Sequence, residues 1–393
     1  MPVTLLHTSD WHVGKAIRGA SRADEHRAVL AEIAEIAAAE SVDVVVVAGD
    51  LFDTSSPAPE SEEIVYRALL DLAGTGAIVA VIAGNHDNSR RLRAVAPLLG
   101  LGNVHLVTEP TRPAAGGVLA LCARDGTPIR LAMLPFVSKR GIVRAADLMD
   151  GEAFENAQRF SDRMRLLVEA LCADFRSDTV NVLAAHAYVL GATTGGGGER
   201  PSHVVEEYAV TAASFPPTIG YGALGHLHRA QRVPAGAMLH YCGSPLTLDF
   251  GEDDGRRQVN VVTLEPGAPA DVTGVALRSG RPLRTITGTF DELAALAGTL
   301  ALADGAWLRV VVRGTRRAGL ADEIRQVIGP SVVDVRVDAP DDERRARPRD
   351  HRGRSPHELF DEYLAGVGVV DDRVRVLFAE LLDDELGSER DAS

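Results

Sequence analysis

The chain has 393 residues, of which 46% are hydrophobic and 24% charged, a composition that excludes a disordered chain and suits two or three globular domains. No apolar run approaches the roughly 18 residues that a membrane-spanning helix needs. The formal net charge of -14 argues against an extended nucleic-acid-binding surface, although a local arginine cluster or bound metal ions can offset it.

The N-terminal part of the chain alternates short apolar runs with amphipathic stretches. Asp10 falls where a signal peptide would have its apolar core, which predicts a cytoplasmic protein. The predicted strands are Thr4–Thr8, Asp43–Ala48 and Ala77–Ala83, and the predicted helices are one with Leu30, Ile33, Ile36 and Ala37 on one face and one at Glu60–Leu72. This β-α-β-α-β order predicts a parallel sheet with right-handed crossovers.

The middle of the chain continues the mixture of helix and strand. A helix is predicted near Asn156–Phe175, and strands at Val180–Ala185, Tyr221–Leu224, Ala237–Tyr241 and Arg257–Leu264. The glycine run Gly195–Gly198 predicts a flexible loop, and it lacks the spacing of a phosphate-binding loop.

A separate module is predicted after about residue 280. Its elements are the strands Pro282–Thr287, Trp307–Val312 and Val332–Val337 and the helices Phe290–Ala301 and Leu320–Ile328. We therefore expect a main domain over residues 1–278, a small α/β cap domain over 279–340, a charged linker over 341–354 and a helical tail over 355–393.

The tail carries two apolar stripes. Ser355 and Pro356 predict a helix start, and Gly366 with Gly368 predicts a break. The first stripe is Leu359, Phe360, Tyr363 and Leu364, and the second is Val374, Leu377, Phe378, Leu381 and Leu382. Two short helices cannot bury both stripes by themselves, so the tail either packs on its own chain or docks on a partner's helices.

Polar side chains with metal-ligand chemistry follow five of the predicted strands. They are Asp10 and His12, Asp50, Asn85 and His86, His186, and His226 with His228. Because ligands bind beyond the carboxyl ends of strands in α/β sheets, these side chains are expected to converge. A lone histidine or aspartate at a strand end is more often a surface, core or turn residue, but the recurrence at every one of these strands favours a site.

The residue types favour a pair of divalent cations. Carboxylates, an amide oxygen and imidazoles without cysteine suit two metal ions with open coordination positions, and they do not suit a closed structural zinc. Such a pair acts on phosphoesters by in-line displacement. His86 adjoins Asn85 and is the spare imidazole, placed to protonate a leaving group.

The series DxH, GDxxD, GNHD, H and GHxH, read from Asp10 to His228, resembles that of the calcineurin-like metallophosphoesterases. The fold this implies is an α/β protein, a β-sandwich with flanking helices. Stretches such as Tyr241-Cys242-Gly243-Ser244-Pro245 and Ser355-Pro356-His357-Glu358-Leu359 are similar to the SbcD family, the nuclease subunits of bacterial SbcCD complexes. The resemblance covers nearly the whole chain.

The resemblance implies roles for individual residues. One metal would be held by Asp10, His12, Asp50 and His228, and the other by Asp50, Asn85, His186 and His226. Manganese is the usual activating ion of the family. Asp53 and Asp87 would orient imidazoles, and the alternative is that both are turn residues. The chain departs from the family at Gly220-Tyr221-Gly222 and in the lengthened loop at Gly195–Gly198, which puts the substrate fit in doubt.

The activity implied is DNA cleavage: exonuclease action on duplex ends and endonuclease action on hairpins or single strands. The implied partners are an SbcC-type ATPase, DNA and a second copy of the chain, joined through the helices at Glu60–Leu72 and Arg91–Leu99. In the tail, Leu359, Phe360, Tyr363, Leu377, Phe378 and Leu381 would contact the ATPase. Two alternatives stay open, a phosphoesterase for small molecules or proteins on the same fold and a catalytically weak regulatory scaffold.

Positive side chains flank the predicted metal ligands. Lys15 and Arg18 follow the DxH motif, and Arg90 and Arg91 follow GNHD. These four are candidate DNA contacts on an otherwise acidic protein. The alternative is a solvated helix face without a binding role.

Overall fold

The computed structural model describes residues 2–138, 160–194, 209–252, 257–300, 305–338, 359–361, 363–364 and 373–378. The chain divides into two compact units, Met1–Arg313 with Arg317–Val337, and Gly314–Arg316 with Asp338–Ser393. The predicted loop Gly195–Gly198, the predicted linker 341–354 and the tail residues Leu381 and Leu382 lie outside the described residues. Among the described helices, none is both long and apolar enough to cross a membrane.

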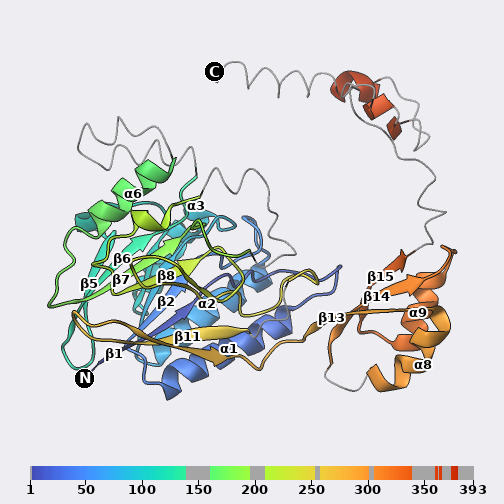
Figure 1. Ribbon diagram of the computed structural model, residues 1–393, viewed down its shortest axis with the longest axis horizontal. Coiled ribbons are helices and arrows are strands. Elements are labelled where there is room, and N and C mark those ends of the chain that lie inside the picture. Colours follow the sequence, from blue (N-terminus) through green and yellow to red (C-terminus); the bar gives the residue numbers. More distant parts are fainter. Residues whose placement is uncertain are drawn as a thin grey trace. The chain divides into compact units, whose positions relative to one another are not determined.

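The first sheet contains the predicted parallel strands (Figure 1). Its strands, in spatial order, are β12 (Asp271–Ala276), β11 (Gln258–Leu264), β1 (Val3–Thr8), β2 (Val44–Ala48), β3 (Ile78–Ile82) and β4 (Val104–Val107). β1 to β4 are parallel, while β11 is antiparallel to β1 and to β12. The connections between β1 and β4 contain α1 (Ala23–Ala39), α2 (Pro59–Gly74) and α3 (Ser89–Gly100).

The second sheet has a parallel centre and antiparallel edges. Its strands, in spatial order, are β5 (Val118–Cys122), β6 (Pro128–Leu134), β7 (Val180–His186), β8 (Tyr221–Gly225), β10 (Leu239–Tyr241) and β9 (Gln231–Val233). β5 and β9 are the antiparallel edges. Helix α6 (Phe160–Leu171) precedes β7, and the short 3-10 helices are η1 (Pro113–Ala115) and η3 (Ala212–Ser214).

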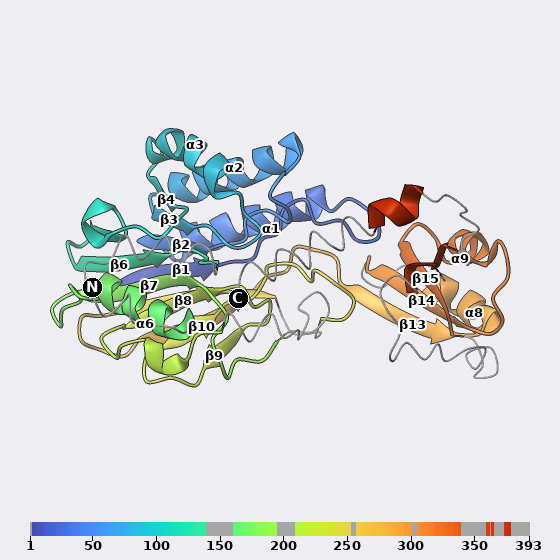
Figure 2. The ribbon, with the colours of Figure 1, turned by 90° about the horizontal axis from the view of Figure 1, so that it is seen from above.

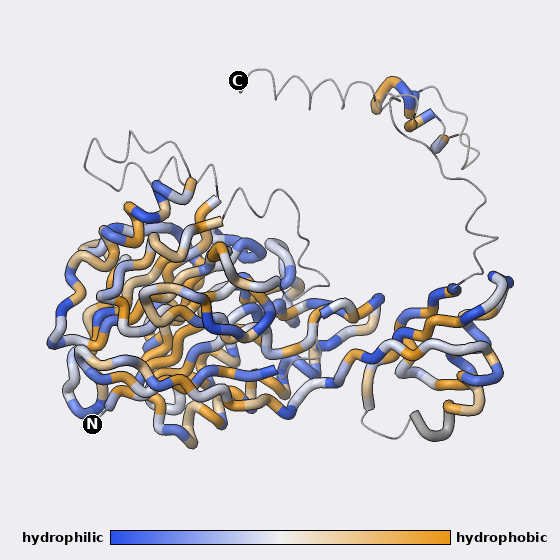
Figure 3. The backbone as a smooth tube through the Cα atoms, viewed as in Figure 1, coloured by the Kyte–Doolittle hydropathy of each residue, from blue (hydrophilic) through white to orange (hydrophobic). Residues whose placement is uncertain are grey.

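The two sheets pack face to face, with helices outside them. In β2, Val44 and Val46 pack between the sheets, whereas Val45 and Val47 pack under α1 and α2. This alternation explains why β2 is an unbroken valine run, since both of its faces are buried. Figure 2 shows α1, α2 and α3 on one side of the sheets and α6 on the other. In Figure 3 the strands of the sandwich are mostly apolar. The predicted fold class is confirmed.

The predicted module after residue 280 has the expected order of elements. They are β13 (Leu283–Gly288), α8 (Phe290–Leu300), β14 (Trp307–Arg313), α9 (Leu320–Ile328) and β15 (Val332–Asp338). The strands form a sheet in the order β13-β14-β15, and apolar residues of α9 pack on it. The helix α9 places Leu320, Ile324 and Ile328 on its buried face, the spacing that the sequence predicts.

The described part of the tail is helical at residues 359–361, 363–364 and 373–378. Phe360 and Phe378 stack on one another with ring centroids 3.9 Å apart, and Arg375 pairs with Asp361 at 2.7 Å. Each apolar stripe therefore covers part of the other. Tyr363 and Leu377 remain 59% and 55% exposed.

Candidate metal centre

The strand-end residues meet at one edge of the sandwich. Asp10 and His12 follow β1, Asp50 follows β2, and Asn85 and His86 follow β3, all in the first sheet. His186 is the last residue of β7, and His226 and His228 follow β8, in the second sheet. The imidazole Nδ1 of His186 lies 2.8 Å from the backbone oxygen of Ala48, which joins the two sheets at this edge. The structure thus brings the predicted metal ligands and His86 together.

The loops after the strands are tight, and glycine is required in them. A Cβ on Gly84 would collide with the carboxylate of Asp50, and one on Gly225 would collide with the backbone oxygen of Ala48. This close approach explains the glycines of the GNHD and GHxH motifs. Asp10, His12, Asp50 and His226 also have positive φ angles of 53°, 46°, 52° and 102°. Such angles are uncommon outside glycine and cluster at functional sites.

Asp10, His12 and His228 form one group whose ligand atoms all lie within 4.8 Å of one another. The carboxylate of Asp10 is fixed by the Ser9 hydroxyl at 2.5 Å and by the backbone amide of His226 at 2.9 Å. Within the described residues, both ring nitrogens of His12 are buried without a hydrogen-bond partner. A buried imidazole in that state is well suited to a metal ion.

A second group surrounds Asn85. Its side-chain oxygen lies 3.0 Å from Nε2 of His186 and 2.9 Å from Nδ1 of His226. Nδ1 of His186 donates to the backbone oxygen of Ala48, so Nε2 is the ring nitrogen that faces the cluster. Nε2 also lies 3.5 Å from a carboxylate oxygen of Asp50. An amide oxygen, a carboxylate and two imidazole nitrogens are thus gathered together, a donor set that would hold a divalent cation.

The charged side chains of this cluster shift one another's pKa values. Burial lowers the pKa of His186, but the charge of Asp50 and a hydrogen bond to Asp50 outweigh burial and raise that pKa to about 9. Burial and the positive charge of His186 lower the pKa of His226 to about 3. Burial would raise the pKa of Asp50, yet the neighbouring imidazoles hold it far below its usual range.

The donor set fits divalent cations. Carboxylate oxygens, imidazole nitrogens and one amide oxygen converge in it. The described cysteines do not take part in the cluster: they form no disulfides, and the thiol of Cys242 is hydrogen-bonded to the hydroxyl of Ser9. Asn85 is exposed and His226 and His228 are half-buried, so the cluster is open to solvent on that side. His/Asp clusters suited to divalent metals are thus present.

His86 lies at the margin of the cluster. Its backbone amide donates to Asp50 at 2.8 Å, and its Nδ1 donates to the backbone oxygen of Asp53 at 2.8 Å. Nε2 is thereby the nitrogen left for chemistry. His86 also groups with His12 and Asp50 within metal-ligand distance, so geometry alone admits a second interpretation of His86 as a ligand.

Asp53 and Asp87 differ in what they contact. Asp53 lies 3.6 Å from Nδ1 of His12, so its role in orienting that imidazole stays a prediction. Asp87 instead accepts hydrogen bonds from the backbone amides of Leu51, Phe52 and Gly84 at 3.2, 3.1 and 2.8 Å. The expectation that Asp87 orients an imidazole is thus not met. Asp87 joins the loops after β2 and β3, because its short side chain points at the amides those loops expose.

The four candidate DNA contacts are not equivalent. Lys15 pairs with Asp53 at 3.1 Å, and Arg18 pairs with Asp334 at 3.3 Å. Arg91 makes a two-pronged ion pair with Glu62 at 2.6 and 2.9 Å. Arg90 is exposed, and within the described residues no ion pair or hydrogen bond of its side chain is found.

Two residues near the cluster were not predicted from the sequence. Phe136 follows β6, stacks on His226 with ring centroids 6.4 Å apart, and meets His186 edge to face at 6.2 Å. Glu252 lies 3.0 Å from Nδ1 of His228. Neither lies in a motif with a metal ligand, so no spacing signal could have found them.

Comparison with known proteins decides the family. A model of calcineurin-like phosphoesterases matches residues 3–229, and a model described as the type 5 capsule protein repressor C-terminal domain matches residues 279–367. The SbcD protein of the Bacillus subtilis nuclease SbcCD is 37% identical over 289 residues, 71% of each chain. The chain belongs to the SbcD family of calcineurin-like phosphoesterases.

Other members of the SbcD family are also similar. The SbcD protein of Escherichia coli K12 is 31% identical over 299 residues, which cover 74% of this chain and 72% of the relative. That of Rhodobacter capsulatus is 29% identical over 380 residues, 91% of this chain and 93% of the relative. The likeness therefore extends beyond the phosphoesterase core into the C-terminal part.

Proposed function

We propose that the chain is a DNA nuclease that hydrolyses phosphodiester bonds with two divalent ions, most suitably Mn²⁺. It acts as an exonuclease on duplex ends and as an endonuclease on hairpins and single strands, in DNA end processing, repair and recombination. It works in the cytoplasm with an SbcC-type ATPase. The supporting observation is the convergence of Asp50, Asn85 and the histidines at one sandwich edge, in a chain of the SbcD family.

The proposed division of labour follows the two groups of side chains. Asp10, His12 and His228 would hold one ion, and Asn85, His186 and His226 would hold the other, with Asp50 close to both groups. When bound, the two metal ions would stabilise the negative charge that develops on the phosphate. The residues of the loops fix the ligands in place, and protonated His86 gives the Nε2 proton to the leaving alkoxide.

The test is cleavage of hairpin DNA with Mn²⁺, with and without the ATPase. The proposal expects cleavage that disappears on chelation and returns with Mn²⁺. Hydrolysis of small aryl phosphodiesters without DNA cleavage would instead support a phosphoesterase of the same fold. Binding to the ATPase without either activity would support a regulatory scaffold.

A homodimer through α2 and α3 is part of the proposal. Leu98 and Leu101 are 70% and 87% exposed, and Leu70 of α2 lies against Gly102 just beyond α3. Exposed leucines gathered on neighbouring elements are typical of an interface. We expect Leu98→Asp with Leu101→Asp to convert a dimer to a monomer in sedimentation at micromolar concentration. A wild-type monomer without the partner would contradict the dimer.

Arg90 is proposed to contact a DNA phosphate. Arg90→Gln should weaken DNA binding and make the slope of log K against log salt shallower by about 1, the loss of one phosphate contact. Arg91→Gln is the matched control on the same helix, because Glu62 already neutralises Arg91. Equal slopes for Arg90→Gln and wild type would contradict the contact.

A further inference from the structure

Glu252 is a buried carboxylate with its partners on opposite sides. Its side chain is 2% exposed, and Oε1 lies 3.0 Å from Nδ1 of His228. Oε2 accepts from Arg257 at 2.9 Å and from the backbone amide of Leu248 at 3.0 Å. Both carboxylate oxygens therefore have hydrogen-bond partners, and the partner of Oε1 is His228, a predicted metal ligand.

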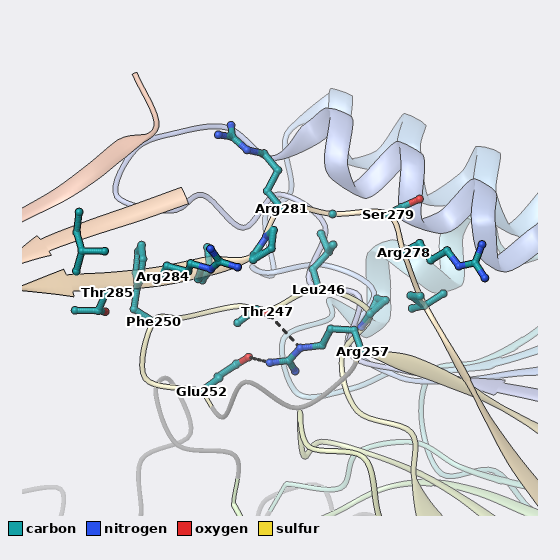
Figure 4. A pocket seen from close by; sticks show the side chains of 16 residues that line it. Leu246, Thr247, Phe250, Glu252, Arg257, Arg278, Ser279, Arg281, Arg284 and Thr285 are labelled. Carbon is teal, nitrogen blue, oxygen red and sulfur yellow. Dashed lines mark hydrogen bonds and ion pairs between the residues drawn. The ribbon is translucent and has the colours of Figure 1, made fainter. Parts of the chain in front are cut away.

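Arg257 holds the carboxylate of Glu252 through Oε2, the oxygen that does not contact His228. Its guanidinium also donates to the hydroxyls of Thr247 and Ser244 and to the backbone oxygen of His228. Figure 4 shows Glu252 and Arg257 pointing toward one another at the wall of a pocket of about 920 Å³, with Thr247 beside them. Arg257 thus keeps Glu252 ionised and immobile, because a buried carboxylate is stable only when paired.

The hydrogen bond between Glu252 and His228 determines the tautomer of the His228 imidazole. A carboxylate accepts a proton from Nδ1, so Nδ1 carries the hydrogen and Nε2 keeps its lone pair. His228 is grouped with Asp10 and His12 within metal-ligand distance. A carboxylate behind a ligating imidazole fixes the ring orientation and raises its basicity toward a metal.

We propose that Glu252 is a positioning residue that orients His228 for the metal ion shared with Asp10 and His12, with Arg257 holding Glu252 in place. The inference rests on the proposed two-metal function. It assigns a role to a residue outside the strand-end motifs, on the loop that follows β10.

The expected effect is on metal affinity. Glu252→Gln keeps the shape of the side chain but replaces the charged acceptor, so the Mn²⁺ dissociation constant of the site that His228 shares with Asp10 and His12 should rise by roughly 10–100-fold. The other site, built around Asn85, should keep its affinity. Glu252→Asp should recover part of the loss, because the charge is kept and only the reach is shortened.

Titration calorimetry and thermal unfolding, each with and without Mn²⁺, separate positioning from support of the fold. In Glu252→Gln the metal-free melting temperature should fall about as much as in Glu25→Gln, which also loses the charge of a buried ion pair, and the rise caused by Mn²⁺ should be smaller than in Glu25→Gln. The Mn²⁺ concentration for half-maximal cleavage should increase, with kcat largely recovered at saturating metal. Glu25→Gln is the matched control, because the carboxylate of Glu25 is buried and bonds to Arg22 and Trp307 rather than to a metal ligand.

Three outcomes would overturn the inference. Unchanged Mn²⁺ affinity in Glu252→Gln would leave the two-metal function intact and remove the role of Glu252. An equal loss of affinity in Glu25→Gln would show that any buried ion pair has the same effect. A wild-type protein that binds no Mn²⁺ would overturn the two-metal function and the role of Glu252 together.

Discussion

Replacement of His86 by alanine is expected to lower DNA cleavage by roughly 10²–10⁴-fold while both metal ions stay bound. The imidazole is held through Nδ1 by the backbone oxygen of Asp53 and through its own amide by Asp50, so Nε2 is free to give a proton. Its neighbour Asn85 faces His186 and His226 through its side chain and is the proposed ligand. Single-turnover cleavage of hairpin DNA measures the loss, and calorimetry with Mn²⁺ counts the ions.

His228→Ala is the comparison variant, because it should lose metal as well as activity. His86 also lies within metal-ligand distance of His12 and Asp50, so the opposite assignment is a real alternative. Loss of a metal ion in His86→Ala would make His86 a ligand. Full activity in His86→Ala would leave it without a role in the reaction.

The sequence predicted the convergence of these Asp, Asn and His side chains because each of them is tied to the end of a strand. A strand such as β2 is recognisable from its valine run, and the residue after it must lie at the sheet edge, so Asp50 could be placed from the sequence alone. The same logic placed Asn85 and His226. The strands β4, β5, β6, β9 and β12 were not predicted, since few of them show a long apolar run or a clean alternation.

Contacts between side chains distant in sequence could not be predicted in the same way. Glu252 reaches His228 through a loop whose path depends on Arg257 and Leu248. The ion pair between Arg91 and Glu62 depends on how α2 and α3 pack together. In the sequence, Arg90 and Arg91 look equivalent, but in the structure Arg91 is neutralised by Glu62 and Arg90 is exposed. Asp87 shows the converse, a residue inside a motif whose neighbours are backbone amides.

The tail raises a related difficulty, because an apolar stripe does not say which of its residues face a partner. Phe360 and Phe378 were expected to contact the ATPase, yet they stack on one another within the tail. Among the stripe members that the structure describes, Tyr363 and Leu377 are left largely exposed. The docking surface is therefore expected to include Tyr363 and Leu377, while the two phenylalanines hold the helices together.

Tyr363→Asp with Leu377→Asp is expected to abolish co-purification with an SbcC-type ATPase, as deletion of residues 355–393 should, while Mn²⁺-dependent cleavage by the isolated chain stays measurable. Charges on an exposed apolar surface oppose docking without removing a packing contact inside the tail. Phe360→Asp with Phe378→Asp should also abolish binding, but by separating the helices, which limited proteolysis of the tail would reveal. Asp361→Asn, which removes only the ion pair with Arg375, is the control expected to bind. Retention of the ATPase with unchanged affinity by the truncated chain would place the docking surface elsewhere.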